Sequence, residues 1–240
     1  MNRMLGNPSV TIAVLTFKRP RDIDEALPLL VDQIARYDGA GTVLVIDNDA
    51  NASAADVVGS HADPRITYVV ESTPGIAAAR NRALCETTTD LIIFIDDDER
   101  PSHDWLSLMV GEYRKHPGTL GVFGLVDSTF GDDPDPWLVA GKFFERRKPP
   151  TGTSLDVVAT NNLLLDMARL RELDLRFDNA YGISGGSDTM FSRQARQRGG
   201  TFFFCGEALV HDVVPADRAT RQWVLKRAHR SGNSWSRTQI

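Results

Sequence analysis

Short apolar runs alternate with amphipathic segments along the first half of the chain. Four runs are rich in β-branched and aromatic residues, which predicts strands, and they span residues 10–17, 42–46, 66–70 and 91–95. The intervening segments predict helices at about 22–37, 54–59 and 75–86. Strands that alternate with helices are joined by right-handed crossovers into a mainly parallel sheet. This pattern predicts an α/β fold, a Rossmann-like sandwich with helices flanking a central sheet.

The pattern changes after a helix expected at about 102–116. Longer apolar stretches predict strands at 120–130 and 157–165, joined by a loop, 131–156, rich in proline, aspartate and basic residues. A loop of this length inside a compact domain is usually functional or poorly ordered, and its aromatic residues favour a lid. The last expected elements are a helix after 187, strands at 201–204 and 208–211, and a basic amphipathic helix from 217 onward.

The composition fits one soluble globular domain spanning residues 1–240. Apolar residues make up 42% and charged residues 25% of the sequence, which is enough for a sizeable core. The net charge of −5 gives no reason to expect a nucleic-acid partner. No apolar stretch approaches the ~20 residues that cross a bilayer, and no signal-peptide core is present. Cys85 and Cys205 fit neither a metal spacing nor a disulfide framework, so we expect a reducing cytoplasmic environment.

The most informative segment is the acidic triplet Asp96, Asp97 and Asp98, which directly follows the apolar run 91–95. A buried strand cannot retain carboxylates, so they should emerge at its carboxyl end, where open α/β sheets bind ligands. Adjacent carboxylates repel one another unless a cation neutralises them. An all-oxygen ligand set suits Mg2+ or Mn2+, which usually hold the phosphates of a nucleotide. A solvated acidic turn is the alternative, and the apolar strand before the acids favours the cation site.

Polar residues also follow the first two predicted strands. Thr16, Phe17 and Arg19 stand at the end of the first strand, and Asp47 and Asn48 at the end of the second. In a parallel sheet these ends are neighbours, so the residues are candidates for a nucleotide site. Asp47 either accepts a hydrogen bond from a base N–H or simply caps a turn or helix.

Two further candidates lie beside glycine-containing turns. Arg80 is about one helical turn beyond Gly75, close enough to the same crevice to reach a base or a phosphate. Asp188 follows Gly185 and Gly186 in the first turn of a predicted helix, where the helix dipole stabilises a carboxylate. It is a candidate general base for an alcohol, and helix capping is the structural alternative.

The last third of the chain adds a histidine and a basic segment. His211 ends a predicted strand, where it either contacts a metal or phosphate or has a structural role. The basic segment after Asp217 is either a solvated helix face or attracts diphosphate groups, on a donor or on a lipid-linked acceptor at a membrane surface. Its cationic and aromatic residues include Arg218, Arg221, Trp223, Lys226, Arg227, His229, Arg230 and Trp235.

Five blocks of this sequence together resemble glycosyltransferase family 2, inverting enzymes of the GT-A fold. The resemblance runs from about residue 10 to residue 232, and the order and spacing of the blocks make it specific. The blocks are residues 16–20 (TFKRP), 45–48 (VIDN), 74–81 (PGIAAARN), 94–101 (FIDDDERP) followed by Trp105-Leu106, and 185–189 (GGSDT).

The resemblance implies a role for each of these blocks. The acidic triplet corresponds to the family's DxD motif, with Asp98 as the direct ligand of Mn2+ or Mg2+ and Asp96 or Asp97 as the ribose or second contact. Asp47 matches the position that recognises the base, usually uracil, and Asp188 matches the catalytic base. Ser187 replaces the usual glutamate, a departure that leaves the base intact. His211 resembles part of a late motif that could complete the metal or diphosphate site.

The resemblance therefore implies transfer of a sugar from a nucleotide sugar, a UDP-sugar first of all, to a hydroxyl acceptor. That acceptor is a glycan, a lipid-linked sugar or a small molecule, in polysaccharide or glycoconjugate biosynthesis. Residues up to about 118 would bind the nucleotide, and residues from about 119 the acceptor. Membrane contact would be peripheral, at the inner face, through the basic C-terminal helix. The alternatives are a non-catalytic sugar-nucleotide or glycan-binding protein, a sugar-nucleotide pyrophosphorylase and a metal-dependent phosphohydrolase. Thr16 stands where a phosphohydrolase would need its aspartate.

Overall fold

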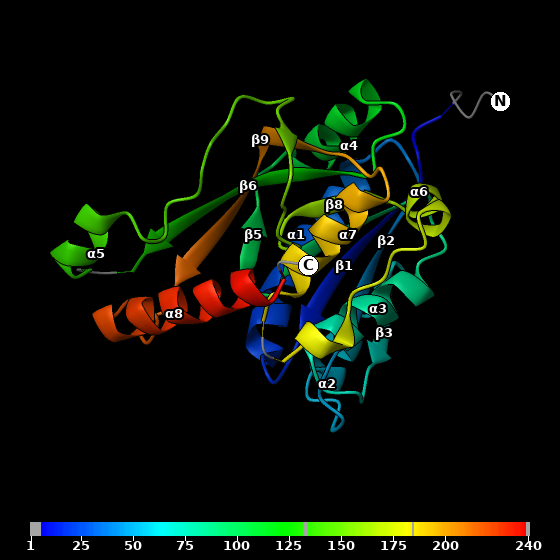
Figure 1. Cartoon of the computed structure of the whole chain (residues 1–240). Coiled ribbons are helices and arrows are strands. Elements are labelled where there is room, and N and C mark those ends of the chain that lie inside the picture. The colour runs from blue at the N-terminus through cyan, green and yellow to red at the C-terminus, as the bar shows by residue number, and fades with distance from the viewer. Residues whose placement is uncertain (1–5, 132–133, 184, 239–240) are drawn as a thin grey trace.

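A central sheet with helices on both faces organises the computed structural model, which describes residues 6–131, 134–183 and 185–238 (Figure 1). The strands are β1 (Val10–Thr16), β2 (Gly41–Asp47), β3 (Ile66–Val70), β4 (Leu91–Asp96), β5 (Glu99–Pro101), β6 (Gly121–Phe130), β7 (Ser154–Leu155), β8 (Leu163–Asp166) and β9 (Phe202–Val214). The α-helices are α1 (Pro20–Arg36), α2 (Ala55–Ser60), α3 (Ile76–Glu86), α4 (Trp105–Lys115), α5 (Pro136–Gly141), α6 (Met167–Glu172), α7 (Ser187–Gln197) and α8 (Arg221–Arg237).

The described strands form one mixed sheet in the order β3-β2-β1-β4-β8-β6-β9-β5, with β7 beside β9. The first four strands are parallel, as the alternation of strands and helices predicts. Beyond β4 the directions vary: β8 is antiparallel to β4 and β6, whereas β6 and β9 are parallel. The α/β fold is confirmed, and antiparallel pairing in the second half makes the sheet mixed.

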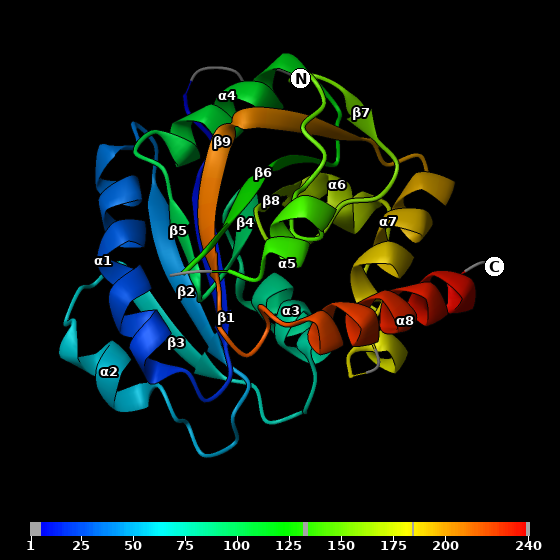
Figure 2. The ribbon, with the colours of Figure 1, turned by 90° about the vertical axis from the view of Figure 1, so that its left-hand side faces the viewer.

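Helices lie on both sides of the sheet (Figure 2). Two apolar cores hold them against it. In α1, Ile23, Leu27 and Leu30 recur at helical spacing and pack with α2 and α4 on one face. On the other face the small side chains of Ala77 and Ala79 let α3 approach the sheet, and α6 and α7 join it there. Alternate residues of each parallel strand enter opposite cores, which explains their continuous apolar character.

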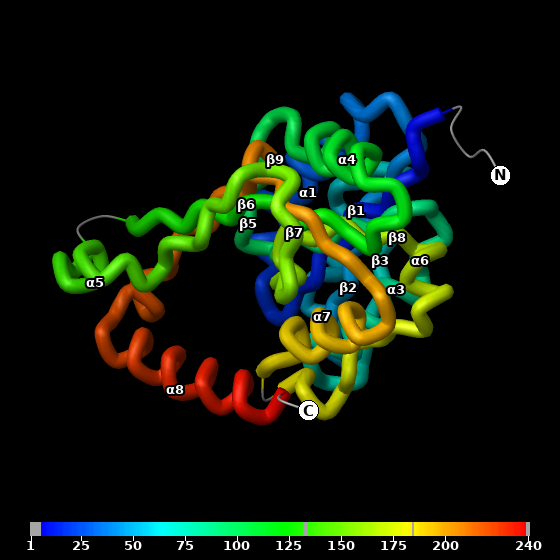
Figure 3. The backbone as a smooth tube through the Cα atoms, turned by 45° about the horizontal axis from the view of Figure 1, so that its top comes forward, coloured from blue at the N-terminus to red at the C-terminus, as the bar shows by residue number. Residues whose placement is uncertain are grey.

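A third, smaller cluster lies away from the two main cores. It joins α5, α8 and the ends of β6 and β9 through Leu138, Phe144, Val214 and Val224. Figures 1 and 3 show α5 and the start of α8 beyond the end of these two long strands, apart from the parallel strands. None of the helices in the described ranges is both long and apolar enough to span a bilayer.

The second half departs from the predicted elements at two places. The strand expected at 157–165 is only β8, Leu163–Asp166, and the strands expected at 201–204 and 208–211 are one strand, β9. A register shift in the β6–β9 pairing, between Gly124 and Leu125, accommodates the interruption around Gly206. Buried Asn162 holds this bulge, because its Nδ2 donates to the carbonyls of Leu125 and Ala208, each at 2.9 Å.

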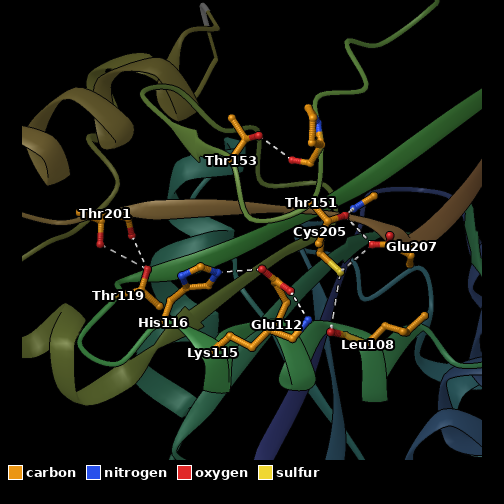
Figure 4. A network of polar contacts seen from close by, with 12 residues as sticks. Leu108, Glu112, Lys115, His116, Thr119, Thr151, Thr153, Thr201, Cys205 and Glu207 are labelled. Atoms are coloured by element: carbon orange, nitrogen blue, oxygen red, sulfur yellow. Dashed lines mark hydrogen bonds and ion pairs between the residues drawn. The ribbon is translucent and has the colours of Figure 1, made fainter.

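The loop expected at 131–156 contains two short elements, α5 and β7. Residues 132 and 133 of this connection lie outside the described residues. Its last part is fixed to β9 and α4 by a polar network (Figure 4). Thr151 donates to Glu207 at 2.5 Å, and His116 stacks on Phe203 and contacts Glu112 at 2.7 Å. Burial alone would raise the pKa of Glu112, but hydrogen bonds from Lys115 and His116 hold it below its usual value.

Candidate active site

A cleft of about 650 Å³ opens at the carboxyl ends of β1 and β4. The parallel register brings Thr16 beside Asp47 and Leu15 beside Asp96, so the strand ends lie side by side as expected. The opposite wall comes from the second half of the chain. Charged and polar residues of the cleft are Thr16, Arg19, Asn48, Asp96, Asp97, Asp98, Glu99, Ser128, Arg146, Asn161, Asp212, Arg218 and Arg227.

Asp97 fixes the acidic triplet to the end of β1. Its carboxylate accepts hydrogen bonds from Thr16 Oγ1 at 2.8 Å and from Arg19 Nη1 at 3.0 Å. Burial raises the pKa of Asp97, and these two donors work against that rise. Arg19 Nη1 also donates to Asp98 at 2.9 Å. Thr16 and Arg19, predicted as candidates for a nucleotide site, thus contact the carboxylates of the triplet directly.

Asp96 and Glu99 form an acidic pair in the wall of the cleft. Burial, reinforced by Asp98, Asp97 and Asp188, raises the pKa of Asp96 to about 7 against the attraction of Arg80. Burial and the nearby Asp96 also raise the pKa of Glu99, whose side chain accepts from the Asp96 N–H at 3.1 Å. Such shifted carboxyl groups in a cleft are typical of functional sites.

Three arginines from the second half face the acids across the cleft. Arg146, Arg218 and Arg227 all line it, and Arg218 Nη1 lies 3.9 Å from Asp98 Oδ2. Burial lowers the pKa of Arg227, and the neighbouring charges of Arg146, Arg230 and Arg218 lower it further. The cleft thus has an acidic wall and a basic wall, an arrangement that suits a cation and an anion bound together.

Asp188 lies in the first turn of α7, after Gly186. Gly186 has φ +96°, and a Cβ there would lie 3.2 Å from Ser234 Cβ of α8, so the turn favours glycine. Asp188 Oδ1 accepts from Arg80 Nη1 at 2.6 Å and from Thr160 Oγ1 at 2.9 Å. It is beside the acidic pair rather than on the wall of the main cleft.

Arg80 has a different environment from the one predicted. Its side chain is buried over the Phe177 ring, with 5.3 Å from Cζ to the ring centroid. It is bonded to Asp188 and lies outside the cleft lining, so its contact with a base or phosphate remains a prediction. Its position indicates that it orients Asp188.

Asp47 also differs from the prediction that it contacts a base. Its side chain is fully buried and accepts from the N–H groups of Asp49 and Ala54, at 2.9 and 2.8 Å, and from Tyr68 Oη at 2.8 Å. These donors occupy both carboxylate oxygens, and Asp47 does not line the cleft. The geometry supports the turn-capping role that the sequence left open.

Asn48 and Phe17 do line the cleft. Asn48 donates through Nδ2 to the carbonyls of Glu71 and Thr73, at 2.8 and 2.7 Å, and accepts from the Gly75 N–H at 2.9 Å. It therefore shapes the connection between β3 and α3 at the edge of the cleft. Phe17 is 55% exposed there, which leaves its ring free to stack on a planar ligand.

His211 does not line the cleft. It lies on the exposed face of β9, whereas the next residue, Asp212, lines the cleft. Successive strand residues point to opposite faces, so Asp212 and not His211 lines the cleft, and the metal contact of His211 remains a prediction. Asp212 accepts from Ser128 Oγ at 3.1 Å, and burial together with Asp98 raises its pKa.

The sequence also missed the segment that precedes β8. Thr160 donates to Asp188, Asn161 Nδ2 donates to Glu99 at 2.7 Å, and Asn162 Oδ1 accepts from Trp105 Nε1 at 2.7 Å. Three consecutive residues thus contact Asp188, the Asp96–Glu99 pair and the core residue Trp105. The only available signal was the polar run Thr160–Asn162 interrupting an otherwise apolar stretch.

The acid wall fits a divalent cation that is shared with a ligand. Within the described residues no three acidic, histidine or cysteine side chains converge as a complete metal cage. Mg2+ usually takes one or two carboxylates and completes its coordination with substrate phosphates and water. Asp98, on the cleft wall and facing the arginines, offers such a carboxylate, with Asp96 behind it.

Comparison with known sequences identifies the family. Residues 11–170 match the sequence model described as glycosyl transferase family 2. The chain belongs to this family. The succinoglycan biosynthesis protein ExoM of Rhizobium meliloti is 34% identical over 231 residues, which cover 95% of this chain and 74% of that protein. The glycosyltransferase assignment is therefore confirmed, and the pyrophosphorylase and phosphohydrolase alternatives fall away.

Solved structures share the fold at lower identity. The S. aureus TarS 1-349 complex with UDP-GlcNAc has a TM-score of 0.63 and 16% identity, and covers 85% of this chain and 58% of that chain. The mannosyltransferase PcManGT of Pyrobaculum calidifontis, in complex with GDP-Man and Mn2+, has a TM-score of 0.68 and 20% identity, covering 97% of this chain and 64% of that chain. This chain spans about three fifths of each structure, and the likeness establishes the GT-A fold.

Proposed function

We propose that this family 2 glycosyltransferase transfers a sugar from a nucleotide sugar to a hydroxyl acceptor with inversion, and that Asp188 is the general base. The observation that carries the proposal is the grouping of Asp98 and Asp188 beside Asp96, at the carboxyl end of β4, with Arg80 bonded to Asp188. A donor site and a base must lie this close for one displacement to occur between them. The half of the chain up to about residue 118 would bind the nucleotide, and the remainder the acceptor.

The two walls of the cleft suit the diphosphate of the donor. We place the diphosphate between Asp98 and the arginines of the second half, Arg218 and Arg227. Mn2+ or Mg2+, held by Asp98, would supply Lewis-acid stabilisation of the departing diphosphate. The arginines would add fixed positive charge on the other side, which stabilises the same negative charge as it develops. Phe17 and Asn48, at the end of this cleft, are placed to contact the nucleoside.

The contacts of Asp188 suit proton abstraction. Arg80 and Thr160 hold Oδ1, so the carboxylate has a fixed orientation beside the donor site. In the proposed step the acceptor oxygen attacks the anomeric carbon from the face opposite the diphosphate. The acceptor proton passes to Asp188 as the bond to the diphosphate breaks, and a single displacement of this kind inverts the anomeric configuration.

A UDP-sugar is the first donor candidate, because uracil is the usual base for the resembled motifs. The TarS structure contains UDP-GlcNAc and the PcManGT structure contains GDP-Man, so both nucleotides enter the test. The relation to a succinoglycan biosynthesis protein favours a glycan or lipid-linked sugar as acceptor. With such an acceptor the enzyme would work in the cytoplasm, in peripheral contact with the inner face of the membrane.

The decisive experiment combines donor binding and transfer. Thermal-shift screening of UDP- and GDP-sugars with Mn2+ identifies the donor, and the product's anomeric configuration is then determined by NMR. Asp188→Asn should abolish transfer while preserving donor binding, and Asp98→Ala should weaken metal-dependent donor binding in calorimetry. Asp104→Asn, on an exposed acid outside the cleft, is the matched control. Near-normal turnover by Asp188→Asn, or a retained configuration, would contradict the proposal.

A further inference from the structure

The segment 136–148, here called the tip, presents apolar side chains at the end of the molecule. It consists of α5 and the residues that follow it, beside the start of α8 (Figure 1). Val139 is 51% and Phe143 is 40% exposed, and the Phe143 ring packs on Trp137 with 4.3 Å between centroids. Aromatic and aliphatic groups held outward in this way favour contact with an apolar partner.

Basic residues surround these apolar groups. The tip contains Lys142, Arg146, Arg147 and Lys148 against a single acid, Glu145. The neighbouring helix α8 contains five arginine or lysine residues and no acidic residue. The whole chain has a net charge of −5, so positive charge is concentrated at this end. An anionic partner is therefore the complementary one.

The exposed groups rest on a packed base. Leu138 and Phe144 of the tip are buried with Val214 and Val224, and Arg221 of α8 forms an ion pair with Asp135 at 2.6 Å. The tip thus has its own small core, separate from the exposed face formed by Val139 and Phe143. Replacing the exposed pair should leave this core in place.

We propose that the tip docks onto the surface of a bilayer containing anionic lipids. Basic residues around exposed aromatic and aliphatic side chains are the composition of interfacial membrane-binding segments. Binding of a soluble polyanion would require the basic residues of the tip but not its exposed apolar side chains. Some of the charge at this end is engaged within the protein, since Lys142 is paired with Glu145 and Lys148 with Asp127. The tip is the docking element because its basic residues stand beside the exposed side chains of Val139 and Phe143.

This docking would bring the membrane beside the cleft. Phe144 and Arg146 of the tip line the cleft, one and three residues beyond Phe143. The inference extends the membrane contact in the proposed function, where it would present a lipid-linked acceptor to the enzyme. Vesicle binding is measured without a donor, so failure of docking and failure of sugar transfer are separate results.

The test is co-sedimentation of the full chain with vesicles of phosphatidylcholine, alone or mixed with phosphatidylglycerol. We expect binding only to the mixed vesicles, and weaker binding at high salt. The double variant Val139→Ser/Phe143→Ser should bind the mixed vesicles about tenfold more weakly, because it removes apolar contact area. The double variant Lys142→Asn/Arg147→Gln should also bind them about tenfold more weakly, because it removes two positive charges. Asparagine at position 142 suits the left-handed conformation there, φ +52°. The matched control, Leu29→Ser/Arg82→Gln, alters exposed residues of α1 and α3 and should bind as the wild type does.

Three results would overturn the proposal. One is the absence of binding to phosphatidylglycerol vesicles. Another is binding that heparin abolishes and that Val139→Ser/Phe143→Ser leaves unchanged, which indicates a site for soluble polyanions. In the last, the Val139→Ser/Phe143→Ser variant binds vesicles as the wild type does but no longer transfers sugar to a soluble acceptor. That result would mean that the tip acts as the lid expected from the sequence. Circular dichroism and donor affinity establish that each variant is folded.

Discussion

Arg80 lies between two carboxylates to which the proposed reaction gives different tasks. Its guanidinium contacts Asp188 directly and lowers the pKa of Asp96 against the effect of burial. A positive charge in this position favours the ionised form of Asp96. Because Arg80 is buried, bonded to Asp188 and absent from the lining of the cleft, we regard it as a positioning residue.

Replacing Arg80 should affect the base more than donor binding. Arg80→Gln should lower kcat roughly tenfold to a hundredfold with little change in the donor KM, since general-base catalysis depends on an oriented, ionised carboxylate. Arg80→Lys should retain most of the activity because it keeps a positive charge beside Asp188, and Arg82→Gln, on the same helix, is the control. An unchanged kcat in Arg80→Gln, or an equal loss of donor affinity, would remove the positioning role.

The raised pKa of Asp96, about 7, predicts a dependence of stability on pH. The folded protein binds this proton more tightly than the unfolded chain, so the contribution is fully present below about pH 4 and is lost as pH rises through 7. The free protein should therefore lose on the order of 2 kcal/mol between about pH 5 and about pH 8 in urea unfolding. Asp96→Asn should lose clearly less. Parallel curves for the two proteins would contradict the assignment.

At the scale of elements, Asp47 holds the connection from β2 to α2. Asp47→Ala should destabilise the fold by on the order of 3 kcal/mol, because it leaves the buried N–H groups of Asp49 and Ala54 without their acceptor. Asp63→Ala is the matched control, since Asp63 caps a more exposed turn through Arg65 and should cost less. Urea unfolding measures the stability of each variant, and calorimetry measures its affinity for UDP. Lost UDP affinity with normal stability would instead support the base contact.

The first half of the fold follows from the sequence because each parallel strand is apolar and local turns mark its ends. The second half does not, since tertiary contacts define its elements. Strand β5, Glu99–Pro101, has no strand-like composition and exists through pairing with β9. The bulge in β9 depends on Asn162, whose left-handed φ of +70° and two carbonyl contacts have no recognisable sequence signal.

The candidate site also contains some residues that the sequence predicts and others that only the folded chain reveals. The acidic triplet, Arg19 and Asp188 were predictable because motifs and strand ends mark them. The sequence does not show which of His211 and Asp212 faces the cleft, because a strand presents alternate residues to opposite faces and the register of β9 decides that Asp212 lines it. Asn161 and Arg146 reach the site from distant segments, and only the folded chain brings them there.

At the scale of the whole molecule, the cleft joins parts of very different stability. The acid wall stands on β1 and β4, between the two large cores. The basic wall depends on α8 and the tip, which share a cluster of only four buried residues, with a few partly buried ones against it. Segments with few buried contacts open locally at a lower free energy than the core. The basic wall should therefore be the more dynamic part of the enzyme.

Hydrogen exchange of the free and ligand-bound protein measures this difference. In the free enzyme, amides of α8 and the tip should exchange faster than those of β1 and β4. UDP with Mn2+ should slow exchange in α8, because an anion bound between Arg218, Arg227 and the acid wall ties the two parts together. Helix α6, outside the cleft, should not change. Slower exchange confined to the acidic wall would mean that Arg218 and Arg227 do not hold the diphosphate. Stabilisation of the departing diphosphate would then depend on the metal alone.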